Sequence, residues 1–135
     1  VYQLKNKLKK AISFGLNKNA DFYAQVNQNN LSGIKAQIIN KNNNIFIEAP
    51  SLVGEFNVYN ILAAVAASNL LNIRLETVSK ALNNFSKVPG RLERFILPNG
   101  AISFIDYAHN PASFKALLST LRAMSSNIIV VFGAG

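Results

Sequence analysis

The spacing of apolar and polar positions divides the chain into two parts with different periods. Up to about Pro50, short apolar runs alternate with polar residues, which is typical of strands. Asparagine-rich stretches separate these runs and favour turns, because asparagine tolerates the positive φ that tight turns need. One such stretch, Asn42–Asn44, is predicted to connect a hairpin. The predicted strands are Ala11–Gly15, Asp21–Asn27, Ile34–Ile39 and Ile45–Glu48.

From Gly54 onward the apolar period becomes that of a helix. Apolar residues recur at i, i+3, i+4 and i+7, which predicts a first helix to about Leu71 with an alanine-rich opposite face. A second helix with the same spacing ends before Lys87–Gly90, a helix-breaking segment that is predicted to link two domains. The two apolar stripes consist of Val58, Ile61, Leu62 and Val65, and of Val78, Ala81, Leu82 and Phe85.

The last third of the chain has the pattern of a βαβ unit. Asn110 before Pro111 predicts a helix start, because the asparagine side chain caps a free N–H and proline suits the first helical position. The continuous apolar run at Ile128–Phe132 is typical of a parallel strand covered on both faces. We therefore expect the second strand of this region to run parallel to the last one through a right-handed crossover. The predicted elements are strands Arg91–Leu97, Ala101–Asp106 and Asn127–Phe132, and helix Pro111–Met124 with a buried stripe of Phe114, Leu117, Leu118 and Leu121.

Composition narrows the possible functions. The chain has no cysteine, which excludes disulfides, zinc–thiolate sites and thiol nucleophiles, and no apolar run reaches the roughly 18 residues of a membrane span. Fourteen basic and six acidic residues give a net charge of +8, which favours an anionic partner such as a nucleotide or nucleic acid. The alternative is compositional bias, since asparagine and lysine crowd the first half.

Candidate chemistry gathers after the strand Ala101–Asp106. Ligands of open α/β sheets bind beyond the carboxyl ends of strands, where Asp106, Tyr107, His109 and Asn110 follow one another. A carboxylate at this place can accept two hydroxyl hydrogen bonds, as ribose recognition requires. The alternatives are a turn or capping role for Asp106 and an ordinary polar role for His109. Because His109 is the only histidine, a histidine-based metal site or a Ser-His-Asp triad within this chain is not expected.

Three further residues could contact a nucleotide. Asn57 and Asn60 lie one turn apart at the start of the first helix, and an amide can read an adenine edge through a donor and an acceptor. Arg91 could reach phosphate or ribose oxygens. The alternatives are N-capping by Asn57, an exposed polar Asn60 and a solvated Arg91. No Walker-type sequence is present, and Gly133–Gly135 is a weak phosphate-loop signal.

In this order and spacing, several segments together resemble the Mur ligase family, in particular its members that add the third peptide residue. The resemblance covers nearly the whole chain and implies the end of a central ATPase domain over residues 1–88, with a mixed sheet, a small β-sheet and helices. Over residues 89–135 it implies the first βαβ unit of a Rossmann-like C-terminal domain. The segments are Leu52–Ala64, Val88–Glu93 and Asp106–Pro111, with Ile12–Gly15, Asn19–Asp21 and Val130–Gly135 in support.

The resemblance also implies a reaction. A cytoplasmic enzyme of peptidoglycan synthesis would use ATP and Mg²⁺ to activate a carboxylate as an acyl-phosphate, which an amine attacks. The acceptor would be UDP-N-acetylmuramoyl-L-alanyl-D-glutamate, the amine diaminopimelate or lysine, and neither nucleic acid nor a membrane would be a partner. By position, Asn60 matches an adenine-contacting asparagine, Arg91 an arginine near the nucleotide and Asp106 a ribose-binding aspartate. Asn57, Tyr107, His109 and Asn110 belong to the same motifs.

The family's phosphate loop, Mg²⁺ ligands and modified lysine are expected upstream of Val1, and the segment that selects the amino acid beyond Gly135. The resemblance thus implies a fragment that holds the adenosine side of the site, contains no catalytic residue or metal ligand, and is inactive alone. Folylpolyglutamate synthase and cyanophycin synthetase share some of the motifs and remain alternatives. A basic, non-catalytic nucleic-acid-binding module is an alternative of another class.

Overall fold

The structure is a computed structural model that describes residues 11–133. The chain divides into two compact units, and the boundary lies between Ser86 and Lys87 in the sequence. The first unit contains a four-stranded sheet and two helices, and the second a two-stranded sheet and one helix. The elements are β1 (Phe14–Gly15), β2 (Phe22–Asn30), β3 (Gly33–Ile39), β4 (Asn44–Ala49), α2 (Glu55–Leu70), α3 (Leu75–Asn83), β5 (Glu93–Ile96), β6 (Ile102–Ile105) and α4 (Pro111–Arg122).

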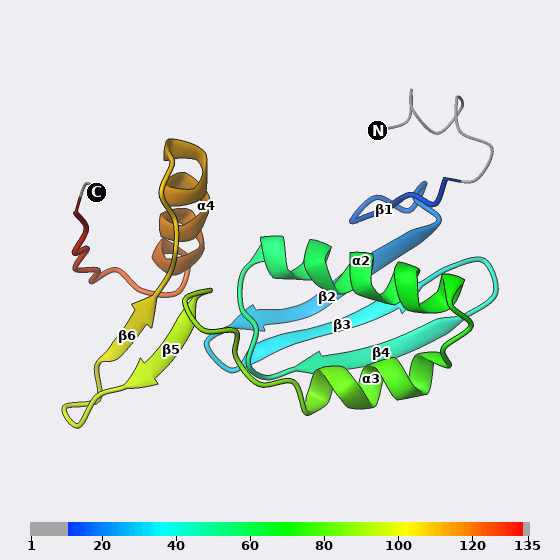
Figure 1. The fold of residues 1–135 in the computed structure, drawn as a ribbon, viewed down its shortest axis with the longest axis horizontal. Coiled ribbons are helices and arrows are strands. Elements are labelled where there is room, and N and C mark those ends of the chain that lie inside the picture. The colour runs from blue at the N-terminus through cyan, green and yellow to red at the C-terminus, as the bar shows by residue number, and fades with distance from the viewer. Residues whose placement is uncertain (1–10, 134–135) are drawn as a thin grey trace. The chain divides into compact units, whose positions relative to one another are not determined.

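The first unit is built on a mixed sheet in the order β1-β2-β3-β4. β1 runs parallel to β2, and the other neighbours are antiparallel (Figure 1). Asp21 holds the short β1 in place, because its Oδ2 accepts from both the backbone N (2.8 Å) and the Oγ (2.7 Å) of Ser13. The Asp21 N–H in turn donates to Ser13 Oγ at 3.0 Å. All four strands predicted for this half are present.

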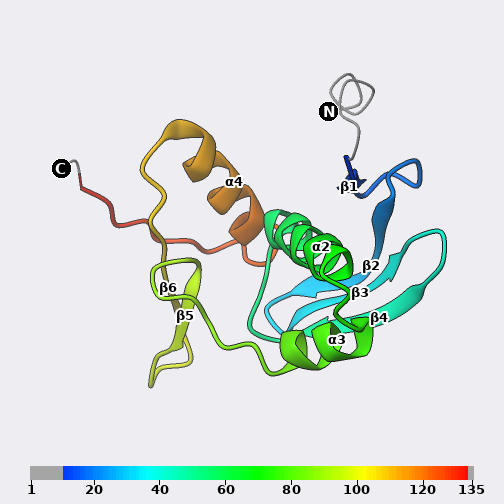
Figure 2. The same ribbon diagram turned by 45° about the vertical axis from the view of Figure 1, so that its right-hand side comes forward.

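The core of this unit lies between one face of the sheet and α2, which crosses that face in both views (Figures 1 and 2). Alternate residues of the strands point to this face because side chains of a strand alternate between its two sides. The predicted apolar stripe of α2 is confirmed. The most deeply buried side chains are Ile34, Ile47, Val58, Leu62 and Val65.

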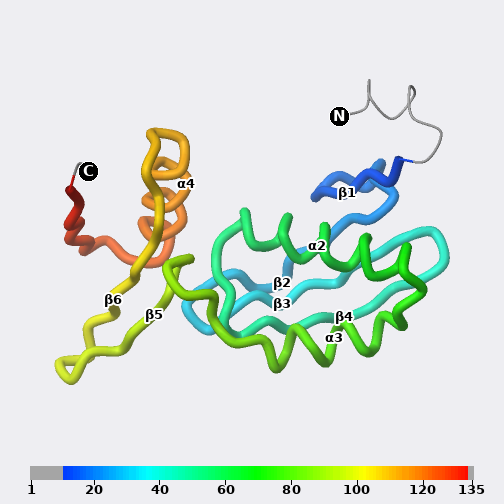
Figure 3. Tube along the Cα trace, viewed as in Figure 1, coloured from blue at the N-terminus to red at the C-terminus, as the bar shows by residue number. Residues whose placement is uncertain are grey.

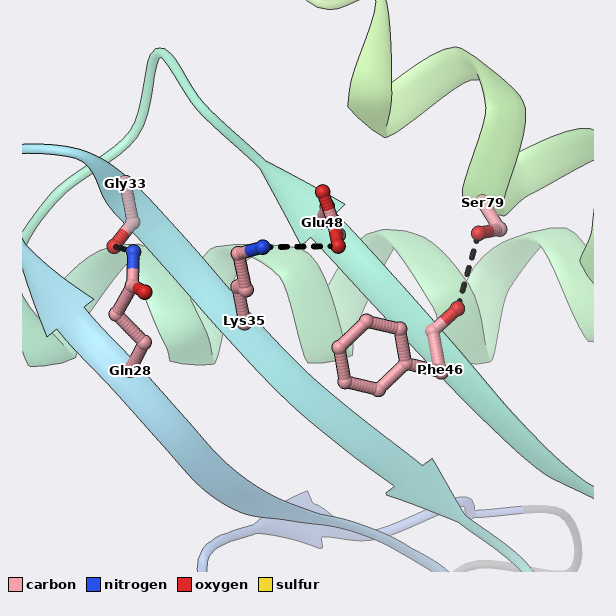
Figure 4. Close-up of polar contacts among 6 residues, drawn as sticks. All are labelled: Gln28, Gly33, Lys35, Phe46, Glu48 and Ser79. Atoms are coloured by element: carbon pink, nitrogen blue, oxygen red, sulfur yellow. Dashed lines mark hydrogen bonds and ion pairs between the residues drawn. The ribbon is translucent and has the colours of Figure 1, made fainter.

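The opposite face of the sheet carries the Lys35–Glu48 pair and the exposed ring of Phe46, and α3 covers the outer edge of β4. The Lys35 Nζ lies 3.0 Å from Glu48 Oε1 across β3 and β4. At the edge, the Ser79 Oγ of α3 donates to the carbonyl oxygen of Phe46 at 3.0 Å (Figure 4). Of the predicted stripe of α3, Val78 and Leu82 are half-buried against the core, whereas Ala81 and Phe85 are exposed.

The hairpin between β3 and β4 is present, although its chemistry differs from the prediction. None of Asn42, Asn43 and Asn44 has a positive φ. Instead, the side-chain oxygen of Asn40 accepts from the backbone N–H groups of Asn42 (2.9 Å) and Asn43 (2.7 Å). The turn therefore depends on a side-chain acceptor one residue beyond β3.

In the second unit, β5 and β6 form an antiparallel hairpin, and the chain then continues into α4 (Figure 3). The predicted helix start is confirmed. Asn110 Oδ1 accepts from the Ser113 N–H at 2.9 Å, Ser113 Oγ accepts from the Asn110 N–H at 3.2 Å, and proline occupies the first turn. This reciprocal capping satisfies donors that a helix end otherwise leaves unpaired.

Two expectations for the second unit are wrong for the described structure. The apolar residues of α4 are half-buried rather than buried, and no strand forms over Asn127–Phe132, so the parallel pair with β6 is absent. A parallel strand needs a neighbouring strand and cover on both faces. Within residues 87–133, α4 is the one helix available, and Ile129 and Val131 remain 94% and 93% exposed. The ring of Phe132 packs on Phe114 with centroids 5.9 Å apart.

Gly33 offers a test of how the β2–β3 hairpin closes. It has φ +110°, and a Cβ there would lie 2.6 Å from both Ala49 O and Pro50 Cα. Gly100 has φ +81° with open space around it, so Gly100→Ala measures the backbone cost alone. We expect Gly100→Ala to lower the free energy of unfolding by about 1 kcal/mol and Gly33→Ala by about 3 kcal/mol, measured by urea denaturation. Equal losses would show that the contact with residues 49 and 50 relaxes freely.

Candidate functional site

The start of α2 carries the two candidate asparagines of the first unit. Gly54, with φ 93°, is the N-cap, and its N–H donates to Asn29 Oδ1 at 2.8 Å. The predicted alternative of N-capping by Asn57 is therefore wrong. Asn57 Nδ2 donates to Val53 O at 2.8 Å, and Asn57 Oδ1 accepts from Asn60 Nδ2 at 3.1 Å.

This chain of amides fixes the orientation of Asn57 and leaves Asn60 exposed. A carboxamide has two N–H donors and an oxygen with two lone pairs. The contact to Asn57 uses one N–H of Asn60, so its oxygen and second N–H are available for a donor–acceptor pair on a ligand.

The residues around Arg91 form a tightly bonded turn, residues 88–92, which we call the linker turn. Three successive N–H groups of this turn are hydrogen-bonded: Gly90 to Glu93 Oε2 (3.0 Å), Arg91 to Val88 O (3.1 Å) and Leu92 to Asp106 Oδ2 (2.7 Å). Positive φ angles of 66° at Gly90 and 47° at Leu92 bracket Arg91. Leucine rarely adopts this conformation, so the surrounding bonds must maintain it.

Asp106 is a structural acceptor in this unit. One carboxylate oxygen accepts from the Leu92 N–H and the other from the Ala108 N–H at 2.8 Å. The turn and capping role that we considered for Asp106 is thus observed. An ionised carboxylate has about four lone-pair sites, so two remain for hydroxyl groups. The two roles are chemically compatible.

Arg91, Tyr107 and His109 form a surface cluster beside Asp106. The Arg91 guanidinium carbon lies 5.8 Å from the centroid of the Tyr107 ring, and the His109 ring packs against that ring edge-on at 5.4 Å. His109 Nδ1 is 3.0 Å from Tyr107 O, and the Tyr107 N–H donates to Gly90 O at 2.9 Å. Tyr107 is 68% exposed, so its ring offers a flat surface next to a cation.

Sequence reasoning missed Glu93. Its Oε1 lies 3.0 Å from Lys87 Nζ, and that ammonium lies 3.9 Å from the centroid of the Phe95 ring. The hydrogen bond from Gly90 and the charge of Lys87 hold the pKa of the Glu93 carboxyl below its usual range. The sequence signal that could have identified Glu93 was its place as an acidic residue three positions after the pair Pro89–Gly90.

The structure brings together one part of the predicted site. Arg91, Asp106, Tyr107 and His109 are neighbours in the second unit, where Asn110 serves in the cap of α4. Asn57 and Asn60 belong to the first unit, so the convergence of Asn60, Arg91 and Asp106 on one ligand stays a prediction. Over residues 11–133 no group of three histidine or acidic side chains is placed to bind a metal ion. No helix of this described region is long and apolar enough to cross a membrane.

The bond between Glu93 and Gly90 is expected to weaken in acid. Because the folded-state pKa of Glu93 lies below its ordinary value of 4.5, its stabilising contribution is complete above that pH and is lost as pH falls through the folded pKa. In an NMR titration, the Gly90 amide shift should move with a midpoint below 4.5. The same amide should not follow this titration in Glu93→Gln. A midpoint at or above the ordinary value would contradict the arrangement.

Two domain families match the sequence, one in each part of the chain. The Mur ligase middle domain matches residues 1–68, and the Mur ligase, glutamate ligase domain matches residues 90–135. A UDP-N-acetylmuramoyl-L-alanyl-D-glutamate–2,6-diaminopimelate ligase of Geobacillus thermodenitrificans is 37% identical over 92% of this chain and 25% of its own length. A UDP-N-acetylmuramate–L-alanine ligase of Dictyoglomus turgidum is 35% identical over 95% of this chain and 28% of its own.

Solved structures agree with these matches. The ligase MurF of Acinetobacter baumannii has a TM-score of 0.73 at 27% identity, covering 84% of this chain and 24% of the solved one. A UDP-N-acetylmuramate-alanine ligase (MurC) of Thermotoga maritima has a TM-score of 0.73 at 26% identity, covering 86% and 27%. The predicted α/β fold class is thereby confirmed, and the chain spans about a quarter of the length of the relatives it matches. The chain belongs to the Mur ligase family and carries parts of its middle and C-terminal domains.

Proposed function

We propose that this chain is part of an ATP-dependent ligase that adds diaminopimelate or lysine to UDP-N-acetylmuramoyl-L-alanyl-D-glutamate. The observation that carries this proposal is the 37% identity over 92% of the chain to a ligase named for that acceptor and 2,6-diaminopimelate. The motifs around Asn60, Arg91 and Asp106 support the nucleotide part of the proposal. The enzyme would act in the cytoplasm, in peptidoglycan synthesis and hence in cell-wall formation and division.

The exposed groups fit the adenosine end of ATP. The free donor and acceptor of Asn60 suit an adenine edge, and the two remaining lone pairs of Asp106 suit ribose hydroxyls. Arg91 adds a cation that can interact with phosphate or ribose oxygens, and Tyr107, which lies under that cation, adds an exposed ring. ATP supplies the phosphoryl group that converts the acceptor carboxylate into an acyl-phosphate open to attack by an amine.

The remaining parts of the machinery are assigned to residues outside this chain. By the resemblance to Mur ligases, of whose length this chain spans about a quarter, we assign the Mg²⁺ ligands, the phosphate loop and the modified lysine to other segments of the intact enzyme. Residues 1–88 are assigned to the middle domain and residues 89–135 to the C-terminal domain. The isolated chain of 135 residues is then expected to be inactive, since the groups that stabilise charge on the transferred phosphoryl group are missing.

The substrate is tested by an acceptor series. We expect the intact enzyme to release ADP with UDP-N-acetylmuramoyl-L-alanyl-D-glutamate plus diaminopimelate or lysine, and not with UDP-N-acetylmuramate plus L-alanine. Turnover with a folate and glutamate, or with arginine and aspartate, would instead support a folylpolyglutamate synthase or a cyanophycin synthetase. Oligonucleotide binding that weakens steeply with salt, without ATP turnover, would support the nucleic-acid-binding alternative.

The nucleotide residues are tested by the Michaelis constants of the intact enzyme. Loss of a hydrogen bond to a charged group costs about 1.5–3 kcal/mol, so Asp106→Ala should raise KM for ATP roughly ten- to a hundred-fold. Asn60→Ala, which removes an exposed neutral group, should raise it about two- to tenfold. Both should leave KM for the UDP-linked acceptor unchanged, as should Asn83→Ala, a matched exposed asparagine on α3. If Asp106→Ala instead raised only the KM for the UDP-linked acceptor, Asp106 would belong to the binding site of that acceptor.

A further inference from the structure

Two carboxylates hold the residues on either side of Arg91 in the linker turn. Glu93 accepts from the N–H of Gly90, and Asp106 accepts from the N–H of Leu92, so that Arg91 lies between the two bonded positions. The β5–β6 register explains why both carboxylates reach the same turn. Glu93 pairs with Ile105, and Asp106 is the next residue along the chain.

We propose that Glu93 is a positioning residue for Arg91, fixing the linker turn so that the guanidinium is held beside Tyr107. The proposal rests on the proposed function only insofar as Arg91 serves a bound nucleotide. In this role Glu93 acts through the Gly90 backbone and through Lys87.

The contacts of Glu93 are suited to this role because they restrain the segment that leads into Arg91 at two positions. Its Oε2 fixes Gly90, directly before Arg91, while its Oε1 draws Lys87 back over the Phe95 ring of β5. The Glu93 side chain is only 14% exposed, whereas the lysine of the pair is 45% exposed. This geometry ties the start of the linker to a regular strand.

The turn needs such fastening because its own conformation is unfavourable. Leu92 adopts φ 47°, a conformation that is unfavourable for leucine, and its side chain is nevertheless only 5% exposed and thus lies in the interior. Without the Gly90–Glu93 bond, the backbone before Arg91 would lose one of its restraints. It would keep the bonds from the Arg91 N–H to Val88 O and from the Tyr107 N–H to Gly90 O. An exposed arginine on a less restrained backbone loses part of the preorganisation that makes its contacts effective.

The test uses the intact enzyme with three variants and two measurements. Glu93→Ala should raise the dissociation constant of ATP, measured by titration calorimetry without acceptor, about 5- to 20-fold, while KM for the UDP-linked acceptor stays constant. Glu93→Gln keeps an oxygen for the Gly90 N–H and should stay within about threefold of wild type. Glu48→Gln removes a second lysine–glutamate pair of the described residues, also at 3.0 Å, and should change neither value.

A double-mutant cycle separates positioning from general stability. If Glu93 acts through Arg91, Glu93→Ala should weaken ATP binding no further in an Arg91→Ala background. Additive losses would overturn the proposal, as would unchanged ATP affinity in Glu93→Ala.

Trypsin provides a readout that does not depend on ATP. Cleavage after Lys87 and Arg91 should be faster in Glu93→Ala than in wild type or Glu48→Gln, because the released turn fits a protease more readily. Unchanged cleavage would overturn the proposal even if ATP affinity fell. If wild type binds no ATP yet cleavage follows the expected order, the proposed function fails while the fastening of the turn by Glu93 stands.

Discussion

Backbone N–H groups that lie outside helices and strands still need acceptors, and in this protein short polar side chains supply many of them. The Asp21 side chain accepts from the N–H of Ser13, directly before β1, and the Asn29 side chain accepts from the N–H of Gly54 at the start of α2. The Asp106 side chain accepts from the N–H groups of Leu92 and Ala108. Each of these bonds fixes a segment that regular structure does not reach. The cluster around Asp106 depends on this constraint, because Arg91, Asp106 and Tyr107 lie in such segments rather than within strands or helices.

Each of the six acidic residues also has a structural role. Four of them accept hydrogen bonds or form ion pairs, and the other two, Glu55 and Glu76, lie in the first turns of α2 and α3, where a negative charge is favourable. With six acids against fourteen basic residues, every acidic residue thus has a structural place.

The sequence predicted those features that depend on local chemistry. The apolar stripe of α2 and the Asn110–Pro111 helix start follow from spacing within one or two turns, and both are present. The strand expected over Asn127–Phe132 was wrong because a strand depends on distant partners that the local pattern does not specify. A turn role for Asp106 followed from the sequence only as an alternative, and the role of Glu93 was missed although its place after Pro89–Gly90 was a signal. The backbone N–H partners of the two carboxylates could not be identified from the side-chain pattern. The side-chain motifs nevertheless located the cluster around Asp106.

The cover that α3 gives to β4 has a consequence for how the sheet meets other chains. An uncovered edge strand presents a row of free N–H and C=O groups to which another chain can add, the usual beginning of edge-to-edge aggregation. Ser79 takes up one of these carbonyls, and α3 packs along the strand. At the other edge of the described sheet, β1 is only two residues long and pairs with Phe22 and Tyr23, so the rest of β2 has no strand beside it on that side among the described residues. An added chain would therefore meet a covered edge at β4 and an open one along most of β2.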